Sequence, residues 1–228
     1  MMMPVKQIVC LANSYKPPHG LCIAGLEIIN EEWGGWVRPV SDRETREVLY
    51  SEYRYENGVP QLLDVIDIPI LRAEPLRHQT ENYVIGPGMW VKRGIIGWDQ
   101  LAAIVEEPNS LWTNTDSTSA GFNDCVSQED AAAIENSLLL IRPENFHVLI
   151  GTNYWTGKRS YRAAFRYNGT LHNLSITDPA IRSVYSSKAL GEYALQDAYL
   201  CVSLTEPYEH DDKCHKLAAA IITEQPLR

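Results

Sequence analysis

The chain has 228 residues, of which 45% are hydrophobic, and a formal net charge of -9 at neutral pH. This length and apolar content predict a globular protein with enough residues for one large domain or two small ones. The negative charge argues against a protein that coats long duplexes regardless of sequence, because such proteins need a broad cationic surface. No apolar run approaches a membrane span and the first residues lack a signal-peptide pattern, so we expect a cytoplasmic protein without a membrane partner.

The first half of the chain contains strand-like runs rich in Val, Ile, Leu and aromatic residues, separated by Gly, Pro and Asn. These runs cover residues 5–11, 21–29, 36–40, 62–70 and 82–85. Polar and aromatic side chains in and beside them form a candidate ligand surface, with packing inside a barrel as the alternative. The candidates in this half are Asn13, Lys16, Trp36, Arg38, His78 and Asn82.

Two helical patterns follow. Apolar residues recur at helical spacing over residues 98–105, and Ser127 with Asp130 three positions later resembles a capping box. The polar stretch 114–123 between them is typical of a surface loop. We therefore predict a helical connecting segment over residues 96–140.

The second half offers five further strand-like runs, at residues 146–150, 159–167, 170–176, 198–204 and 215–222. Two sets of five short strands match the OB-fold, a small, partly open Greek-key barrel that binds oligonucleotides and oligosaccharides on one face. We therefore predict a mainly β protein with a few helices and two tandem OB-like five-stranded barrels. The barrels are expected at residues 1–95 and 141–228.

The stretch from Gly151 to Lys188 is basic although the chain is acidic, with six Lys or Arg residues against one acid, Asp178. Such a block of opposite charge marks a docking place for an anionic partner. Residues 158–167 alternate at period two, which places basic residues on one face of a strand and aromatic residues on the other. A half-buried antiparallel strand shows the same alternation whatever its function, so that reading stays open. The residues predicted to contact nucleic acid here are Lys158, Arg159, Arg162, Arg166, Tyr154 and Trp155.

No catalytic fingerprint is present. Residues 151–158 resemble a phosphate-binding P-loop but fail its spacing, and the following residues predict a strand instead of a helix, so we expect no cofactor. His210, Cys214 and His215 could ligate a metal, but no complementary Cys or His pair exists elsewhere, and we expect a solvated acidic loop. The five cysteines include no C-x-x-C pair and predict no disulfide framework.

Several motifs resemble the bacterial dual-OB-domain family. They are I-V-C-L-A-N-S-Y-K from Ile8, C-I-A-G from Cys22, G-G-W-V-R-P-V-S from Gly34, L-L-D-V from Leu62, H-Q-T-E-N-Y from His78 and V-S-L-T-E-P-Y from Val202. The resemblance spans residues 5–222. It implies two OB barrels in one chain and a role in sensing nucleic acid or nucleotides, often alongside effectors of defence systems.

These observations together predict a non-catalytic module that binds a short single-stranded RNA or DNA, or a nucleotide, within a bacterial defence system. Two alternatives stay open. One is a protein–protein adaptor that docks an effector protein, and the other is an enzyme that acts on nucleotides with a dispersed active site. The sequence leaves open the ligand, the protein partner and the oligomeric state.

Overall fold

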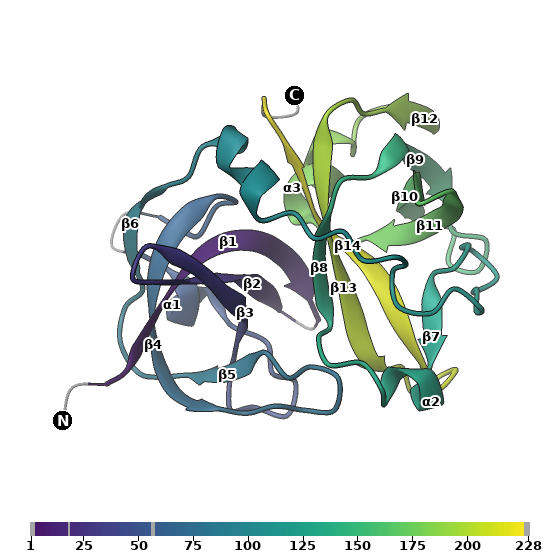
Figure 1. Cartoon of the computed structure of the whole chain (residues 1–228). Helices are drawn as coiled ribbons and strands as arrows, with labels where there is room; N and C mark the ends of the chain where they lie inside the picture. The colour runs from purple at the N-terminus through teal and green to yellow at the C-terminus, as the bar shows by residue number, and fades with distance from the viewer. Residues whose placement is uncertain (1–2, 18, 56–57, 226–228) are drawn as a thin grey trace. The chain divides into compact units, whose positions relative to one another are not determined.

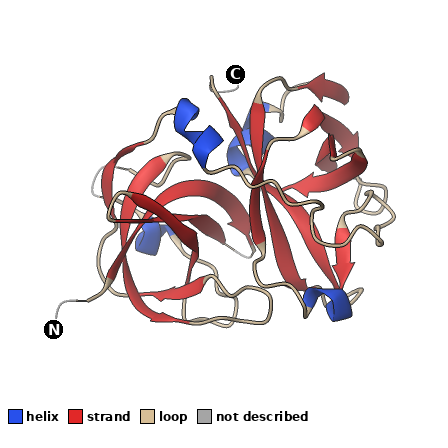
Figure 2. Ribbon diagram, viewed as in Figure 1, coloured by secondary structure: helices blue, strands red, loops and turns tan. Residues whose placement is uncertain are grey.

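The computed structural model describes residues 3–17, 19–55 and 58–225. The chain is mainly β, which confirms the predicted fold class (Figures 1 and 2). Its backbone divides into two compact units, Met1–Ile104 and Val105–Arg228, and each is described by itself. Within the described ranges, no helix is both long enough and apolar enough to cross a membrane.

The first unit is a closed barrel. Its strands are β1 (Val5–Lys16), β2 (Gly20–Ile29), β3 (Glu32–Val40), β4 (Asp64–Ala73), β5 (Asn82–Ile85) and β6 (Val91–Ile95), with a short helix α1 (Tyr50–Tyr53) and a 3-10 helix η1 (Trp98–Ala103). The strand order is β1-β2-β3-β5-β4, and β4 pairs back onto β1. Strands β3 and β5 run parallel, whereas the other barrel neighbours are antiparallel. Strand β6, which the sequence did not predict, extends the sheet beyond β4.

Alternation of apolar residues builds the core of this barrel. Along β4, the side chains of Ile66, Ile68 and Ile70 are buried, while Asp67 lies between them on the other face. The buried face packs against Ile8 of β1. This is the period-two pattern of a strand with one face in the core.

The second unit repeats the strand order. Its elements are β7 (Cys125–Ser127), α2 (Gln128–Ala131), β8 (Leu138–Ile141), β9 (Glu144–Thr152), β10 (Arg159–Tyr167), β11 (Thr170–Ile176), α3 (Pro179–Val184), β12 (Gly191–Ala194), β13 (Ala198–Pro207) and β14 (Lys213–Thr223). The path β9-β10-β11-β14-β13-β8 contains one parallel pair, β11 with β14. This parallel pair corresponds to β3 with β5 in the first unit.

Strands β8 and β9 together take the place of β1. Strand β8 pairs with β13 and β9 pairs with β10, as the two parts of β1 pair with β4 and β2. Arg142 and Pro143 separate β8 from β9. Proline has no backbone N–H to donate to a ladder, so one continuous strand is interrupted there. The second barrel therefore keeps the OB strand order with its first strand broken in two.

The predicted helical segment 96–140 differs from the structure. It contains only the short helices η1 and α2, and it includes strands β7 and β8. Ser127 does cap α2 as predicted, since its Oγ accepts a hydrogen bond from the Asp130 N–H at 3.0 Å. The four apolar residues of β8 are buried and paired with β13, so pairing that is distant in sequence overrides the local helical pattern.

Candidate nucleic-acid interface

Strand β10 lies at the centre of the second unit and carries the predicted alternation. Tyr161, Ala163, Phe165 and Tyr167 are buried in the core, where Phe165 contacts the ring of Phe146 edge-on at 5.9 Å. The intervening residues lie on the outer face of the sheet. Because β9 and β11 flank β10 on both sides, this outer face is a sheet surface and not a free edge.

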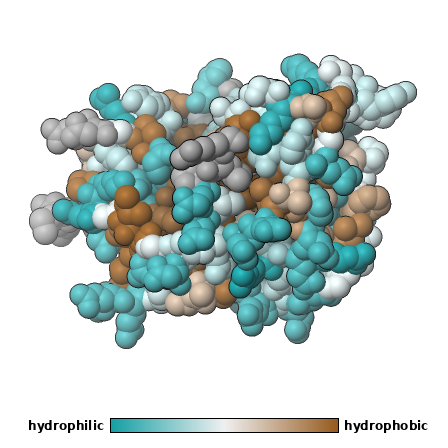
Figure 3. Space-filling view, turned by 90° about the horizontal axis from the view of Figure 1, so that it is seen from above, coloured by the Kyte–Doolittle hydropathy of each residue, from teal (hydrophilic) through white to brown (hydrophobic). Residues whose placement is uncertain are grey.

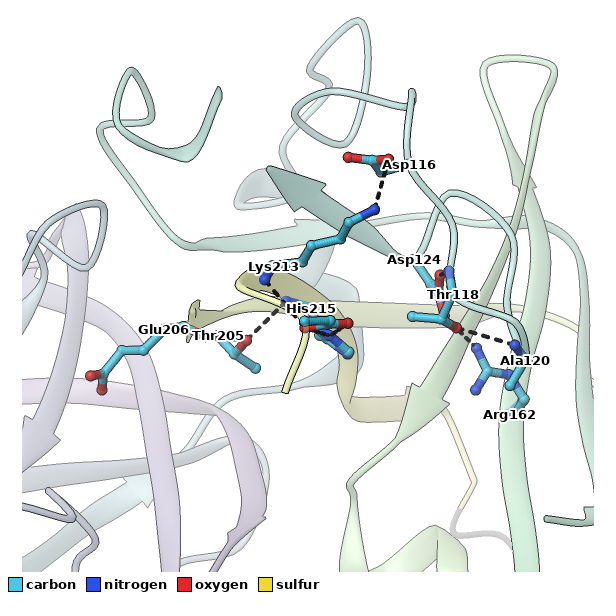
Figure 4. Close-up of polar contacts among 10 residues, drawn as sticks. Asp116, Thr118, Ala120, Asp124, Arg162, Thr205, Glu206, Lys213 and His215 are labelled. Carbon is cyan, nitrogen blue, oxygen red and sulfur yellow. Dashed lines mark hydrogen bonds and ion pairs between the residues drawn. The ribbon is translucent and has the colours of Figure 1, made fainter. Parts of the chain in front are cut away.

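Arg162 is already engaged on that outer face. Its guanidinium donates to Asp124 Oδ2 at 2.9 Å (Figure 4). It also donates to both the side-chain oxygen and the carbonyl of Asn173. The Arg162 side chain is only 17% exposed, and burial lowers its pKa while Asp124 opposes that shift. Arg162 was predicted as a phosphate ligand; in this arrangement it serves as an internal ion-pair partner.

The Asp124 carboxylate belongs to an overlying segment, which we define as residues 113–125. Asp124 also accepts hydrogen bonds from the backbone N–H and the hydroxyl of Thr118, both at 2.7 Å. A Cβ at Gly121 would lie 1.9 Å from Asp124 Oδ2, so glycine is required for this close approach. Asp116 pairs with Lys213 of β14 at 2.9 Å (Figure 4). The stretch predicted as a plain surface loop is therefore fastened to the second barrel.

Two buried basic side chains, Lys216 and His172, lie beside this segment. Lys216 donates to the Thr113 carbonyl and to Asn114 Oδ1, and burial lowers the Lys216 pKa to about 8. His172 is fully buried and stacks on Phe165 with ring centres 5.2 Å apart. Burial, and then the charge of Lys216, lowers the His172 pKa to about 4. His172 is therefore neutral at physiological pH.

A second group of cations has no carboxylate partner. Within the described ranges, no ion pair involves the group that we call the cation cluster: Lys158, Arg159, Arg182 and Lys188. The Arg159 and Arg182 guanidinium carbons lie 6.0 and 5.5 Å from the centre of the Tyr161 ring. Arg159 also donates to the carbonyl of Lys188. The predicted Arg166 is exposed and donates a hydrogen bond to the Gly169 carbonyl.

The single acid of the basic stretch does not neutralise this cluster. Asp178 is buried, and its carboxylate accepts three backbone N–H groups, from Ala180 and Ile181 at the start of α3 and from Ile221 of β14. Burial raises the Asp178 pKa, while these three bonds oppose the shift. Asp178 therefore caps α3 and fixes the helix that carries Arg182.

Two aromatic rings stand beside the cluster on the loop that joins β9 to β10. Tyr154 and Trp155 are 88% and 80% exposed, with ring centres 5.1 Å apart in an edge-on contact. The loop is held by Asn153, whose Oδ1 accepts the backbone N–H groups of Trp155 and Thr156 at 3.0 and 2.9 Å. The rings therefore do not cover the barrel end, and they lie on an ordered turn where a flat ligand has access.

The candidates of the first unit are mainly internal. Trp36, His78 and Asn82 are buried, and Arg38 is buried in an ion pair with Glu81 at 3.1 Å. The two remaining candidates lie on β1: the Asn13 amide donates to a backbone carbonyl, and Lys16 is half-buried. The candidate interface is therefore built from the second unit alone.

Other polar features of the second unit offer less to an anion. An open cavity of about 450 Å³ lies beside the β8–β9 break, but its Arg142 pairs with Asp197 at 3.2 Å. Of the candidate metal ligands, His215 pairs with Asp211 and Cys214 is buried. The part of the chain that the structure describes holds no group of three His, Cys, Asp or Glu side chains placed to bind a metal ion. On the face drawn in Figure 3, hydrophobic residues lie interspersed among hydrophilic ones.

The strand order of both units defines a protein built from OB-type barrels, the architecture of a binding module. A family model described as the Dual OB-containing domain matches residues 6–221, and the chain belongs to this family. The family resemblance seen in the sequence motifs is thereby confirmed. No curated protein and no solved structure gives a significant match.

Neither Arg182 nor Lys188 was selected as a site residue from the sequence. Both lie in the basic stretch, but the alternation of one strand selects only residues of that strand. The excess of positive charge over the whole stretch is the signal that includes them.

Proposed function

We propose that the second unit binds a short single-stranded nucleic acid at the cation cluster and at the Tyr154–Trp155 loop. The observation that carries this proposal is a group of four cations that have no carboxylate partner among the described residues, in a chain of net charge -9. Arg159 and Arg182 share the Tyr161 ring, cations at such spacing repel, and an anion that docks beside them relieves that repulsion.

The neighbouring aromatic rings favour a nucleic acid over other anions. Proteins that bind single strands combine a positively charged groove with exposed rings on which bases stack. Tyr154 and Trp155 supply such rings, and Lys158 follows them in the same loop. The loop after the first strand borders the ligand face of OB-folds, and here this is the β9–β10 loop.

The wider setting is part of the proposal. We propose a cytoplasmic location from the absence of a membrane-spanning or signal-peptide pattern in the sequence, and a place beside an effector protein of a bacterial defence system from the family resemblance alone. A nucleotide in place of an oligonucleotide presents the same phosphate and base chemistry to this surface.

Fluorescence anisotropy with labelled single-stranded RNA and DNA of about ten nucleotides tests the proposal. Each base stacked on a ring contributes about 1–3 kcal/mol, so the variant Tyr154→Ala/Trp155→Ala is expected to lose at least about tenfold in affinity. Tyr50, an exposed ring of the first unit, provides the matched control Tyr50→Ala. Equal affinity of all three proteins would refute the assignment of the rings.

A further inference from the structure

The cation cluster draws its residues from several segments of the chain, whereas a track along a nucleic-acid backbone would be extended. Arg159 comes from the start of β10, Arg182 from α3 and Lys188 from the chain after α3, so three separate segments contribute. The two guanidinium groups converge on one ring, that of Tyr161. A backbone track would instead spread its cations along a strand, as Arg162 and Arg166 are spread on β10.

Arg159 carries a second, independent sign of a ligand. Its Nε is buried and has no hydrogen-bond partner among the described residues. A buried donor without a partner loses its hydration with no bond in return, and such groups are rare in folded proteins. A small shift of the Arg159 side chain would let an oxyanion accept this N–H, and guanidinium groups match phosphate oxygens through paired donors.

Aromatic rings hold the third cation. The Lys188 ammonium lies 4.8 Å from the centre of the Tyr185 ring and 5.6 Å from that of Tyr193. These two rings contact each other edge-on at 5.5 Å, and the Tyr193 hydroxyl donates to the Ala189 carbonyl. The ring faces attract the ammonium without neutralising its charge. Lys188 is therefore held in place with its positive charge still available to an anion.

We infer that Arg159, Arg182 and Lys188 form a subsite for a phosphate monoester, the terminal phosphate of a nucleic-acid strand. A terminal phosphate carries about two negative charges near neutral pH and three acceptor oxygens, whereas each internal phosphodiester carries only one charge. Two guanidinium groups at one ring, with Arg159 also bonded to the backbone of Lys188, match the larger, concentrated charge. Arg159 follows directly from the β9–β10 loop that carries the stacking rings of Tyr154 and Trp155. The inference rests on the proposed function and specifies which end chemistry of the strand is recognised.

The test compares three forms of one labelled oligonucleotide: with a 5′-phosphate, with a 3′-phosphate, and with hydroxyl groups at both ends. One phosphorylated form is expected to bind about tenfold or more tightly than the hydroxyl form, because it gains charge-assisted hydrogen bonds. Arg182→Gln on the exposed surface of α3 should abolish that difference while the hydroxyl form still binds. The matched control is Arg166→Gln, which removes the same charge from β10 outside the subsite and should keep the difference.

Each outcome decides something different. Equal binding of all three forms would overturn the terminal-phosphate subsite and leave the proposed function standing. Absence of binding by every form would overturn both. Competition by inorganic phosphate and by a nucleoside monophosphate separates the sources of the phosphate. A monophosphate that competes as well as the phosphorylated strand would identify a mononucleotide as the ligand of the subsite.

Discussion

Removal of the Asp124 carboxylate should destabilise the second unit strongly. Asp124→Ala leaves the Arg162 guanidinium buried without its counter-ion and leaves the Thr118 N–H without its acceptor. Removing one partner of a buried ion pair costs about 3–5 kcal/mol. Because Arg162 keeps its two hydrogen bonds to Asn173, we expect the free energy of unfolding to fall by about 3 kcal/mol. For a unit of this size, such a loss lowers the unfolding temperature by roughly 10 °C.

Thermal unfolding followed by circular dichroism measures this loss, and hydrogen exchange at the amides of β10 and β11 assigns it to the second unit. Asp197→Ala is the matched control, because Asp197 forms an ion pair with Arg142 in which both side chains are largely exposed. Such surface pairs contribute about 0–1 kcal/mol. Equal unfolding temperatures of the two variants would refute the view that Asp124 fastens the overlying segment. The same reasoning makes Arg162→Glu an unsuitable probe of binding, because it opposes two carboxylates in a buried place.

Two further predictions concern buried titratable groups. Because the His172 pKa is about 4 when folded and near 6.5 when unfolded, the unfolded chain takes up a proton first as pH falls. The free energy of unfolding should therefore decrease as the pH is lowered from about 6.5 to 4, by up to about 1.4 kcal/mol per pH unit. Urea titrations at a series of pH values measure this slope, and His172→Phe should remove it. An unchanged slope in the variant would contradict the assignment. Asp178→Ala leaves three backbone N–H groups without their acceptor. It should lower the free energy of unfolding in the same titrations by about 2–4 kcal/mol. A loss below about 0.5 kcal/mol would show that water replaces the carboxylate.

Much of the fold follows from local patterns. The runs at residues 159–167 and 170–176 coincide with β10 and β11, because one face of each strand is buried and the alternation is strong. Strands β6 and β12 were missed because both are short and largely exposed, and they are defined only by a neighbouring strand. Strand β8 lacked a local signal that separates a buried strand from a helix.

The candidate site was only partly predictable. The excess of cations and the exposed aromatic pair are properties of consecutive residues, so the sequence displays them. The pairing of Arg162 with Asp124 joins residues 38 positions apart, and no periodicity reports such a contact. Likewise, the Arg182 guanidinium lies 5.5 Å from the Tyr161 ring, a contact between two elements that local patterns do not report. Folding therefore engages the predicted Arg162 in an internal ion pair. It also brings Arg182 and Lys188, which the strand pattern did not select, to the candidate site.

The salt dependence of oligonucleotide binding tests the central claim most directly. If the cation cluster contacts phosphates, the logarithm of the association constant should fall with the logarithm of salt concentration with a slope of about -2 to -3. The slope should come close to zero in Lys158→Glu/Arg182→Glu and stay unchanged in Arg54→Glu, which reverses an exposed cation of the first unit. A native protein that binds no single strand at low salt, or a slope that the double variant keeps, would contradict the account.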